Sequence, residues 1–275
     1  MAVASVPITH GGSSMLKSVA ALNGRAFDTD PVIAYMLLGM SQQERLAYLP
    51  TYWTALVKSA LLNHAVITEA DGWKAASVLI PPGGYIENVW TLLWAGFLGV
   101  LWKIGLPGVK RLWTEFSGMT DNAKKNGLRG HTQYYYVFSI GTEREHRGKG
   151  LAKAIIQEHQ KTAQAANLPI WLEATTTGSR ALYLSMGFKE VEEIRLGKGK
   201  VAADASIQPH GPGVTLWAMV SFYLSIRLLL AYSNNSTNST KKKHSPQETL
   251  CKLFKALRIR PALILPVRSV IILSL

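Results

Sequence analysis

The residues best suited to chemistry in this sequence lie in a short basic loop, EREHRGKGLAKAII, over residues 143–156. Gly148 and Gly150 let the backbone turn tightly and approach a ligand with no Cβ in the way. The N–H groups around them open a helix, where unpaired donors and the helix dipole favour negative charge. Arg147 and Lys149 add positive charge beside these donors. The loop is therefore predicted to bind a phosphate group.

Two common phosphate-binding patterns do not fit this loop. A P-loop needs four residues between its first glycine and Gly-Lys, whereas Lys149 alone separates the two glycines here. A dinucleotide-binding loop reads GxGxxG, and Lys153 stands at the position of the third glycine. The loop thus predicts an anion site of another kind.

Strands and helices on both sides must position this loop. Residues 132–142 are β-branched or aromatic on both faces, as a central buried strand should be, and a helix over 151–166 follows the loop. Asp71-Gly72 turns a hairpin upstream. The other predicted elements are helices over 26–39 and 41–64, a strand over 168–176, a helix over 178–186, and strands over 187–197 and 213–220. This order predicts a single α/β domain.

A tryptophan-rich segment over residues 89–104, VWTLLWAGFLGVLWKI, is apolar nearly all round. It is too short to span a bilayer, which takes about 20 apolar residues. Three interpretations are open: a buried pair of helices, a lid over a substrate pocket, or a surface that docks on a membrane. Trp94 and Trp102 lie eight residues apart and can share one side of a helix.

Two motifs in this order resemble the GNAT superfamily of N-acetyltransferases. The first is YYYVFSIGTEREHRGKGLAKAII, and the second is ALYLSMGFKEV, in which Tyr183, Gly187 and Phe188 match the Tyr-x-x-x-Gly-Phe signature. The resemblance covers residues from about 20 to 219. It implies an α/β GNAT fold, with a central mixed and mostly antiparallel sheet, splayed to hold CoA and flanked by helices. A narrower likeness to antibiotic-inactivating small-molecule acetyltransferases rests on the IPPGG hairpin end, the tryptophan-rich helices and LEATTTGSRALY.

The resemblance implies acetyl-CoA as co-substrate and assigns residues to it. The pyrophosphate lies on the loop, and the pantetheine arm pairs with the edge of the preceding strand like an added β-strand. The implied cofactor-binding residues are Ile140, Gly141, Thr142, Arg147, Gly148, Lys149, Gly150, Leu151 and Ala152.

In this family an amine attacks the thioester directly, and a tyrosine protonates the leaving thiolate. Tyr183 matches that tyrosine, although a packed aromatic residue is the alternative. Glu173 is the candidate base, unless it caps the neighbouring helix, and His131 is a weaker candidate. No residue pair resembles a nucleophile with its base, and no histidines or acids have metal-ligand spacing.

The sequence therefore predicts an N-acetyltransferase acting on a small-molecule amine. A protein or peptide N-acetyltransferase, or an acyl-CoA-binding relative without turnover, is the alternative. The start of the sequence lacks the pattern of a secretory signal, and Cys251 alone cannot form an internal disulfide, which favours a cytoplasmic protein. No base-reading motif accompanies the basic charge, so no nucleic-acid partner is expected.

The chain of 275 residues is predicted to divide into an acetyltransferase domain over residues 1–219 and a tail over 220–275. From Ser221 onward nine Lys and Arg stand against one acid, so the tail carries +8 of the net charge of +13. Three origins for the tail are open: a disordered basic segment, a membrane contact through residues 214–232, which is not favoured, or a retained intron. Val220-Ser221 can be encoded by the intron-donor consensus GTGAGT.

Overall fold

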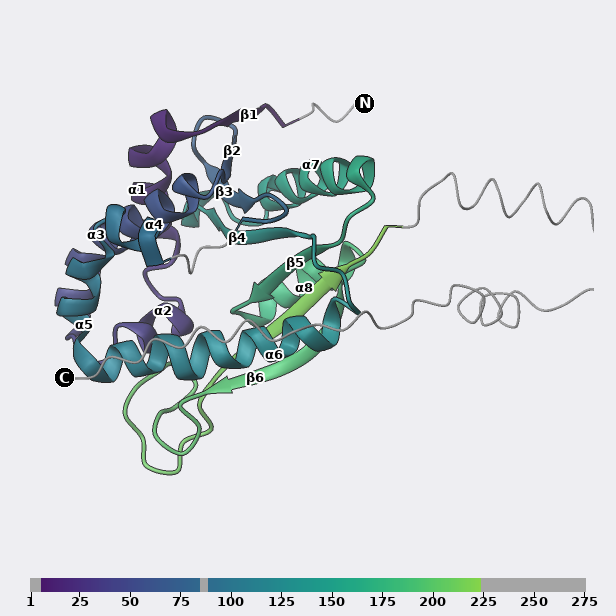
Figure 1. Cartoon of the computed structure of the whole chain (residues 1–275). Helices are drawn as coiled ribbons and strands as arrows, with labels where there is room; N and C mark the ends of the chain where they lie inside the picture. The colour runs from purple at the N-terminus through teal and green to yellow at the C-terminus, as the bar shows by residue number, and fades with distance from the viewer. Residues whose placement is uncertain (1–5, 85–88, 224–275) are drawn as a thin grey trace, which may run out of the picture. The chain divides into compact units, whose positions relative to one another are not determined.

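The computed structural model describes residues 6–84 and 89–223, so most of the predicted tail lies outside the described residues. The described part contains a seven-stranded sheet in the order β1-β2-β3-β4-β5-β7-β6 (Figure 1). Its strands are β1 (Ile8–Gly11), β2 (Val66–Ala70), β3 (Ala75–Ile80), β4 (Tyr135–Thr142), β5 (Ile170–Ala174), β6 (Lys189–Leu196) and β7 (Val214–Ser221). The β4–β5 pair is parallel and the other neighbours are antiparallel, which confirms the predicted mixed, mostly antiparallel sheet.

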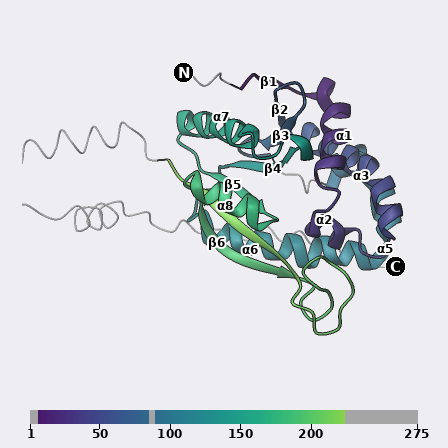
Figure 2. The ribbon, with the colours of Figure 1, turned by 180° about the vertical axis from the view of Figure 1, so that it is seen from behind.

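Helices cover both faces of this sheet. They are α1 (Leu16–Ala26), α2 (Pro31–Met36), α3 (Gln42–Leu62), α4 (Val89–Trp94), α5 (Phe97–Lys110), a π-helical turn η2 (Arg111–Ser117), α6 (Gly118–Gly127), α7 (Leu151–Ala166) and α8 (Thr177–Ser185). On β7, Ala218 packs in one core cluster with Ala123 of α6, whereas Met219 packs in another with Ile156 of α7. Successive strand residues point to opposite faces. Figures 1 and 2 accordingly show α6 and α7 on opposite sides of the sheet.

The predicted single helix over residues 26–39 is wrong, because the chain breaks between α1 and α2. The Asp30 side chain accepts hydrogen bonds from the N–H groups of Val32 (2.9 Å) and Ile33 (3.0 Å), and Pro31 occupies the first turn. Both features start a helix rather than continue one. The break brings Asp30 to the sheet, where it matters for the site described below.

The helices α4 and α5 leave their tryptophans on the surface. Trp90, Trp94 and Trp102 are 72, 76 and 91% exposed, so the interpretation of a fully buried helix pair is wrong for these side chains. Leu92 and Phe97, by contrast, are buried in the cluster that contains α1 and α3 residues. Within the described ranges, the model has no helix with the length and apolar character needed to cross a bilayer.

Candidate active site

The neighbouring strands β4 and β5 separate part-way along their length. They pair at Tyr135 with Ile170 and at Tyr136 with Trp171, and β4 then continues beside β3 as far as Thr142. A register shift on the β3 side leaves Phe138 as the extra residue of a bulge. Bulges bend a strand, so the β5-facing edge of β4 beyond Tyr136 borders a cleft instead of another strand.

This opening, which we call the loop cleft, has a volume of about 650 Å³ and runs from the strand edge to the basic loop. Eight of the nine predicted cofactor-binding residues line it, together with Tyr183: Ile140, Gly141, Thr142, Arg147, Gly148, Gly150, Leu151 and Ala152. Lys149 is the exception, since its ammonium group lies 3.1 Å from Nδ1 of His146. The sequence prediction therefore selected residues that share one cleft.

The basic loop has the backbone geometry of an anion site. Gly148 and Gly150 have φ values of 77° and 80°, in the left-handed region that favours glycine. The first backbone bond of α7 runs from the N–H of Ala154 to the carbonyl of Gly150 (2.9 Å), so the preceding N–H groups have no partner within the helix. These donors open towards the cleft, where they can bind phosphate oxygens.

The side chain of Arg147 holds the loop in place. Its guanidinium donates to the carbonyl oxygens of Ala26 (2.8 Å) at the end of α1 and of Thr142 (3.3 Å) at the end of β4. A second contact also joins α1 to the start of the loop, because the guanidinium of Arg25 on α1 donates hydrogen bonds to the carboxylate of Glu143. The loop is thus fixed to α1, and Arg147 acts partly as its support.

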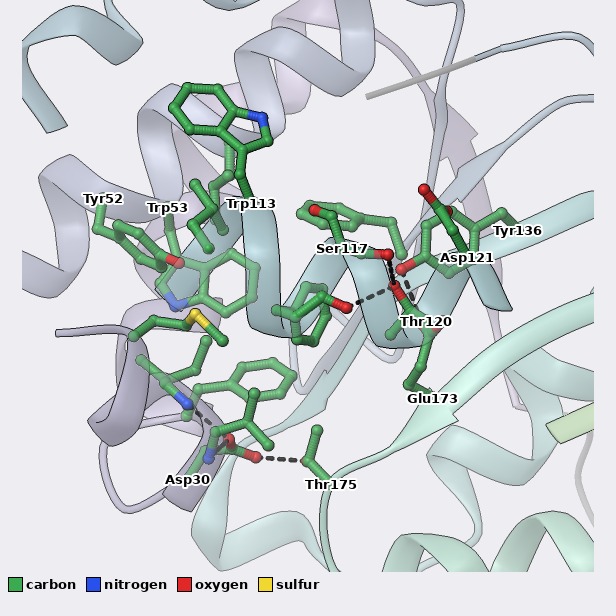
Figure 3. Close-up of a pocket in the computed structure, with 18 of the residues that line it drawn as sticks. Asp30, Tyr52, Trp53, Trp113, Ser117, Thr120, Asp121, Tyr136, Glu173 and Thr175 are labelled. Carbon is green, nitrogen blue, oxygen red and sulfur yellow. Dashed lines mark hydrogen bonds between the residues drawn. The ribbon is translucent and has the colours of Figure 1, made fainter. Parts of the chain in front are cut away.

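A second opening, the apolar cavity, lies beside the loop cleft and has a volume of about 320 Å³. Figure 3 shows its labelled residues, which come from α3, η2, α6, β4 and β5, from the N-cap of α2 and from the residue directly after β5. Its wall is largely aliphatic and aromatic, with Tyr52, Trp53, Leu92, Phe97, Leu112 and Phe116 among the lining residues. Three carboxylates, from Asp30, Asp121 and Glu173, also line it, together with Lys124, whose ammonium group lies 3.4 Å from the carboxylate of Asp121. Such a cavity suits an apolar molecule that carries a cationic group.

The two openings meet where the strands separate. Five residues line both of them: Phe27, Asp30, Phe138, Glu173 and Thr175. A ligand in the loop cleft and a second ligand in the apolar cavity can therefore come into contact at this junction. Such a junction between two ligand sites suits a group-transfer reaction.

The predicted base Glu173 stands at this junction on β5 and is half-buried. Its carboxylate accepts hydrogen bonds from the hydroxyl of Tyr136 (2.7 Å) and from the indole N–H of Trp171 (2.7 Å). Thr176 caps α8 through the N–H of Ser179, so the alternative that Glu173 caps this helix does not hold. Each carboxylate oxygen keeps a further lone pair for a third donor.

Tyr183 on α8 lines the loop cleft and is 4% exposed. Its ring packs against Phe188, with centroids 5.7 Å apart. Burial raises the pKa of this phenol, so the hydroxyl stays protonated and can donate a hydrogen bond at neutral pH. Tyr183 is both a packed aromatic residue and a donor that lines the cleft.

Asp30 is a site residue that the sequence analysis missed. Besides capping α2 it accepts a hydrogen bond from the hydroxyl of Thr175, the residue directly after β5 (2.5 Å). Burial raises the pKa of its carboxyl group, against the lowering effect of these hydrogen bonds. The Asp-Pro pair was the available signal for a helix start, but it does not indicate the contact with Thr175.

The weaker base candidate, His131, lies away from this junction. It is exposed, and its ring faces Phe222 with centroids 5.6 Å apart. In residues 6–84 and 89–223, no three or more His, Cys, Asp and Glu side chains form a group that could hold a metal ion.

Comparison with known proteins agrees with this geometry. A family model described as an acetyltransferase (GNAT) domain matches residues 119–190, which include the loop, α7, β5 and α8. An uncharacterized N-acetyltransferase of Schizosaccharomyces pombe is 24% identical over 197 residues, 71% of this chain and 79% of the relative.

Two solved structures show how far the fold extends. One is a "histone acetyltransferase HPA2 and related acetyltransferase" from Corynebacterium glutamicum, 16% identical over 80% of this chain and 97% of that one, with a TM-score of 0.53. The other is arylalkylamine N-acetyltransferase 2 from Aedes aegypti, 17% identical over 80% and 99%, with a TM-score of 0.54. At these identities the likeness shows the fold alone. Residues 119–190 match a GNAT acetyltransferase domain, and this match, with the relative named an N-acetyltransferase, indicates an acetyl-CoA-dependent acyltransferase.

Proposed function

We propose that this chain moves the acetyl group of acetyl-CoA directly to the amine of a small molecule with an apolar body. The observation that carries the proposal is the junction at Glu173, where the loop cleft opens into the apolar cavity. Acetyl-CoA occupies the loop cleft, with its pyrophosphate on the glycine loop and its thioester at the junction. The acceptor occupies the apolar cavity and presents its amine to the thioester.

The character of the apolar cavity supports a small acceptor. Its volume of about 320 Å³ lies at the lower end of the range for small-molecule sites. Aromatic and aliphatic side chains suit an apolar body, while the carboxylates of Asp30 and Glu173 suit the cationic form of an amine. The narrower likeness to antibiotic-inactivating enzymes stays a prediction.

The proposed reaction needs one base and one acid. The neutral amine attacks the thioester carbon, a C–N bond forms, and Glu173 takes the proton that the nitrogen loses. The C–S bond then breaks and the Tyr183 hydroxyl gives its proton to the sulfur, which yields the N-acetyl product and free CoA thiol. Solvent afterwards returns a proton to Tyr183 and removes one from Glu173. Asp30 is a positioning residue, since it holds Thr175 and the start of α2 at the junction.

Thiol release from acetyl-CoA by the full chain tests this function with three groups of acceptor. We expect arylalkyl and alkyl amines to give the highest kcat/KM, polyamines to give less, and peptides with a free amino terminus to give little. Turnover confined to peptides would instead assign the site to protein N-acetylation. Acetyl-CoA binding without thiol release for any acceptor would identify a relative without turnover.

Two variants test the assigned roles. Glu173→Gln keeps the shape of the side chain and removes the base, so kcat/KM should fall by about 10²–10⁴-fold at neutral pH. Part of that loss should be recovered at higher pH, where more of the amine is neutral. Asp30→Asn retains an acceptor for the N–H groups of α2 and should change KM for the amine more than kcat. Equal losses in both variants, with no recovery at high pH, would contradict this division of roles.

A further inference from the structure

A row of exposed apolar side chains runs along α4 and α5. Trp90, Trp94, Leu98, Trp102 and Leu106 follow one another at intervals of four residues, and they are 72, 76, 58, 91 and 84% exposed. We call these five residues the tryptophan ridge. Trp90 and Trp94 lie four residues apart within α4, and Leu98 and Trp102 lie four residues apart in the first part of α5, so each pair shares one side of its helix. Leu106 follows the kink at Gly105.

Both helices turn their other side to the core. Leu92 of α4 and Phe97 and Val100 of α5 are buried in one cluster, which also contains residues of α1, α3 and β3. The ridge side chains therefore project from the side of each helix that faces away from this cluster. The side chains on the inner side of each helix pack in the core, whereas the ridge side chains on the outer side do not.

The tryptophans of the ridge are more exposed than the chain's other tryptophans. Trp53, Trp171 and Trp217 are 3, 0 and 8% exposed, and Trp113 of η2, at 38%, is less exposed than any tryptophan of the ridge. An exposed apolar patch of this kind marks an interaction site in soluble domains.

The charges around the ridge indicate the kind of surface that it contacts. From residue 89 to residue 114 the sequence has three basic residues, Lys103, Lys110 and Arg111, and no acidic residue. Lys103 and Lys110 are exposed, and the exposed carboxylate of Glu44 on α3 interacts electrostatically with Lys103. Tryptophan and leucine flanked by lysine are typical of helices that lie in the interface of a membrane, with the lysines near lipid phosphates. The helix α5, with 14 residues, is too short to span the bilayer.

We propose that the tryptophan ridge docks the domain on the surface of an anionic lipid bilayer. The tryptophan rings enter the headgroup region, and Lys103 and Lys110 pair with lipid phosphates. Since Leu92 and Phe97 on the same helices line the apolar cavity, docking also places one wall of that cavity next to the lipid. The proposal goes beyond the proposed function and does not depend on turnover.

Binding of the full chain to vesicles tests this proposal. One set of vesicles contains equal parts of phosphatidylcholine and phosphatidylserine, and the other contains phosphatidylcholine alone. We expect the chain to partition onto the mixed vesicles, and the double variant Trp94→Ala/Trp102→Ala to lose at least about tenfold in partition coefficient. Lys103→Glu/Lys110→Glu should remove the preference for the anionic lipid.

A matched control removes exposed apolar groups elsewhere. Leu184 and Ile207 are 42 and 79% exposed and lie outside the ridge, so Leu184→Ala/Ile207→Ala should bind vesicles as the unaltered chain does. Thermal melting checks that each variant is folded. We expect all of them to fold, because the substituted side chains are exposed to solvent. Lipids with brominated chains should quench the fluorescence of the unaltered chain more than that of the tryptophan variant.

Three outcomes would overturn the proposal. If the full chain binds neither kind of vesicle, the docking proposal is refuted. Equal binding by the tryptophan variant and the unaltered chain assigns the contact to another part of the sequence, such as residues 224–275. Self-association in sedimentation experiments that disappears in the tryptophan variant, without vesicle binding, assigns the ridge to a second copy of the chain.

Discussion

At the scale of single residues, the glycines of the basic loop are constrained by their backbone conformation and by the ligand they serve. A Cβ added at Gly148 meets no atom within 4 Å, so crowding inside the protein does not require glycine there. Its φ of 77°, and the space that a phosphate needs next to the N–H groups, account for the choice. A side chain at this position would occupy the place of the ligand.

Gly148→Glu should therefore abolish the stabilisation of the chain by acetyl-CoA. A ligand at about 100 times its dissociation constant adds roughly 2.7 kcal/mol to the free energy of unfolding, or about 5–10 °C in Tm for a domain of this size. The variant places a carboxylate at the proposed site of the pyrophosphate, so its Tm should not rise with acetyl-CoA.

Gly130 supplies a matched control for that experiment. It has a φ of 85°, and an added Cβ there also meets no atom within 4 Å, but it does not line the loop cleft. Gly130→Glu carries the same backbone strain and charge and should keep the full rise in Tm. A rise that survives in the Gly148 variant refutes the loop as the pyrophosphate site.

Tyr183→Phe should separate packing from proton donation. The variant keeps the ring against Phe188 and removes the hydroxyl, so the rise in Tm with acetyl-CoA should stay. Loss of a general acid lowers kcat by about 10²–10⁴-fold. The loss should be largest for the least nucleophilic amines, whose transition states place the most negative charge on sulfur. Steady-state thiol release over a series of amines measures both effects.

Tyr48 provides the comparison for this variant. It is half-buried and lines neither the loop cleft nor the apolar cavity, so Tyr48→Phe should leave kcat unchanged. Full kcat in the Tyr183 variant as well would mean that the tyrosine only packs, and that water or a backbone N–H meets the leaving sulfur.

At the scale of elements, α7 is held to the sheet partly by a buried polar contact. Nε2 of His159 on α7 lies 2.6 Å from the hydroxyl of Ser77 on β3, and both residues are buried. Burial and, to a smaller extent, the nearby His10 together lower the pKa of His159 to about 3. In the folded chain the imidazole of His159 is therefore neutral at neutral pH.

Acid should destabilise the fold through His159. The folded pKa of about 3 lies below the ordinary value, so between about pH 6.5 and 3 the unfolded chain takes up a proton that the folded chain refuses. The contribution is present in full above pH 6.5 and falls by about 1.4 kcal/mol per pH unit below it. Urea unfolding at several pH values should show a shallower acid loss for His159→Gln than for the unaltered chain.

The exposed His131 is the control for this pH series. His131→Gln should show the acid dependence of the unaltered chain, because this exposed side chain takes no part in the contact between α7 and β3. An identical slope for His159→Gln and the unaltered chain would contradict the assigned role of the buried histidine.

The same elements show what the sequence could reveal. The glycine loop and the Tyr-x-x-x-Gly-Phe signature are local patterns, so they located the loop cleft before the fold was known. Asp30 and the apolar cavity could not be found in this way. Residues of α2, α3, α6 and β4 meet there through tertiary packing, which no local pattern encodes. The tryptophans illustrate the same limit, since an apolar run looks alike whether it is buried or exposed.

At the scale of the whole molecule, the strand β7 determines where the domain ends. It lies between β5 and β6, and Ser221 pairs with Ile170 while Val220 pairs with Trp171 and with Lys189. A domain that stops at residue 219, as predicted from the sequence, would lose these last pairs of a central strand. We therefore propose Tyr223, the last described residue, as the end of the domain.

A chain that ends at Tyr223 should fold and bind acetyl-CoA without the remaining residues. The removed segment has nine Lys and Arg and one acid, so the net charge falls from +13 to +5 while the described sheet is kept. Because the described residues that line the loop cleft and the apolar cavity all lie between Ala26 and Tyr183, the Tm should rise by the same 5–10 °C or so with acetyl-CoA as in the full chain. A chain that ends at Gly213 removes β7 and should not fold, since β5 and β6 then lose their shared partner. If the chain ending at Tyr223 melts without a cooperative transition, or loses its response to acetyl-CoA, the residues beyond it belong to the domain.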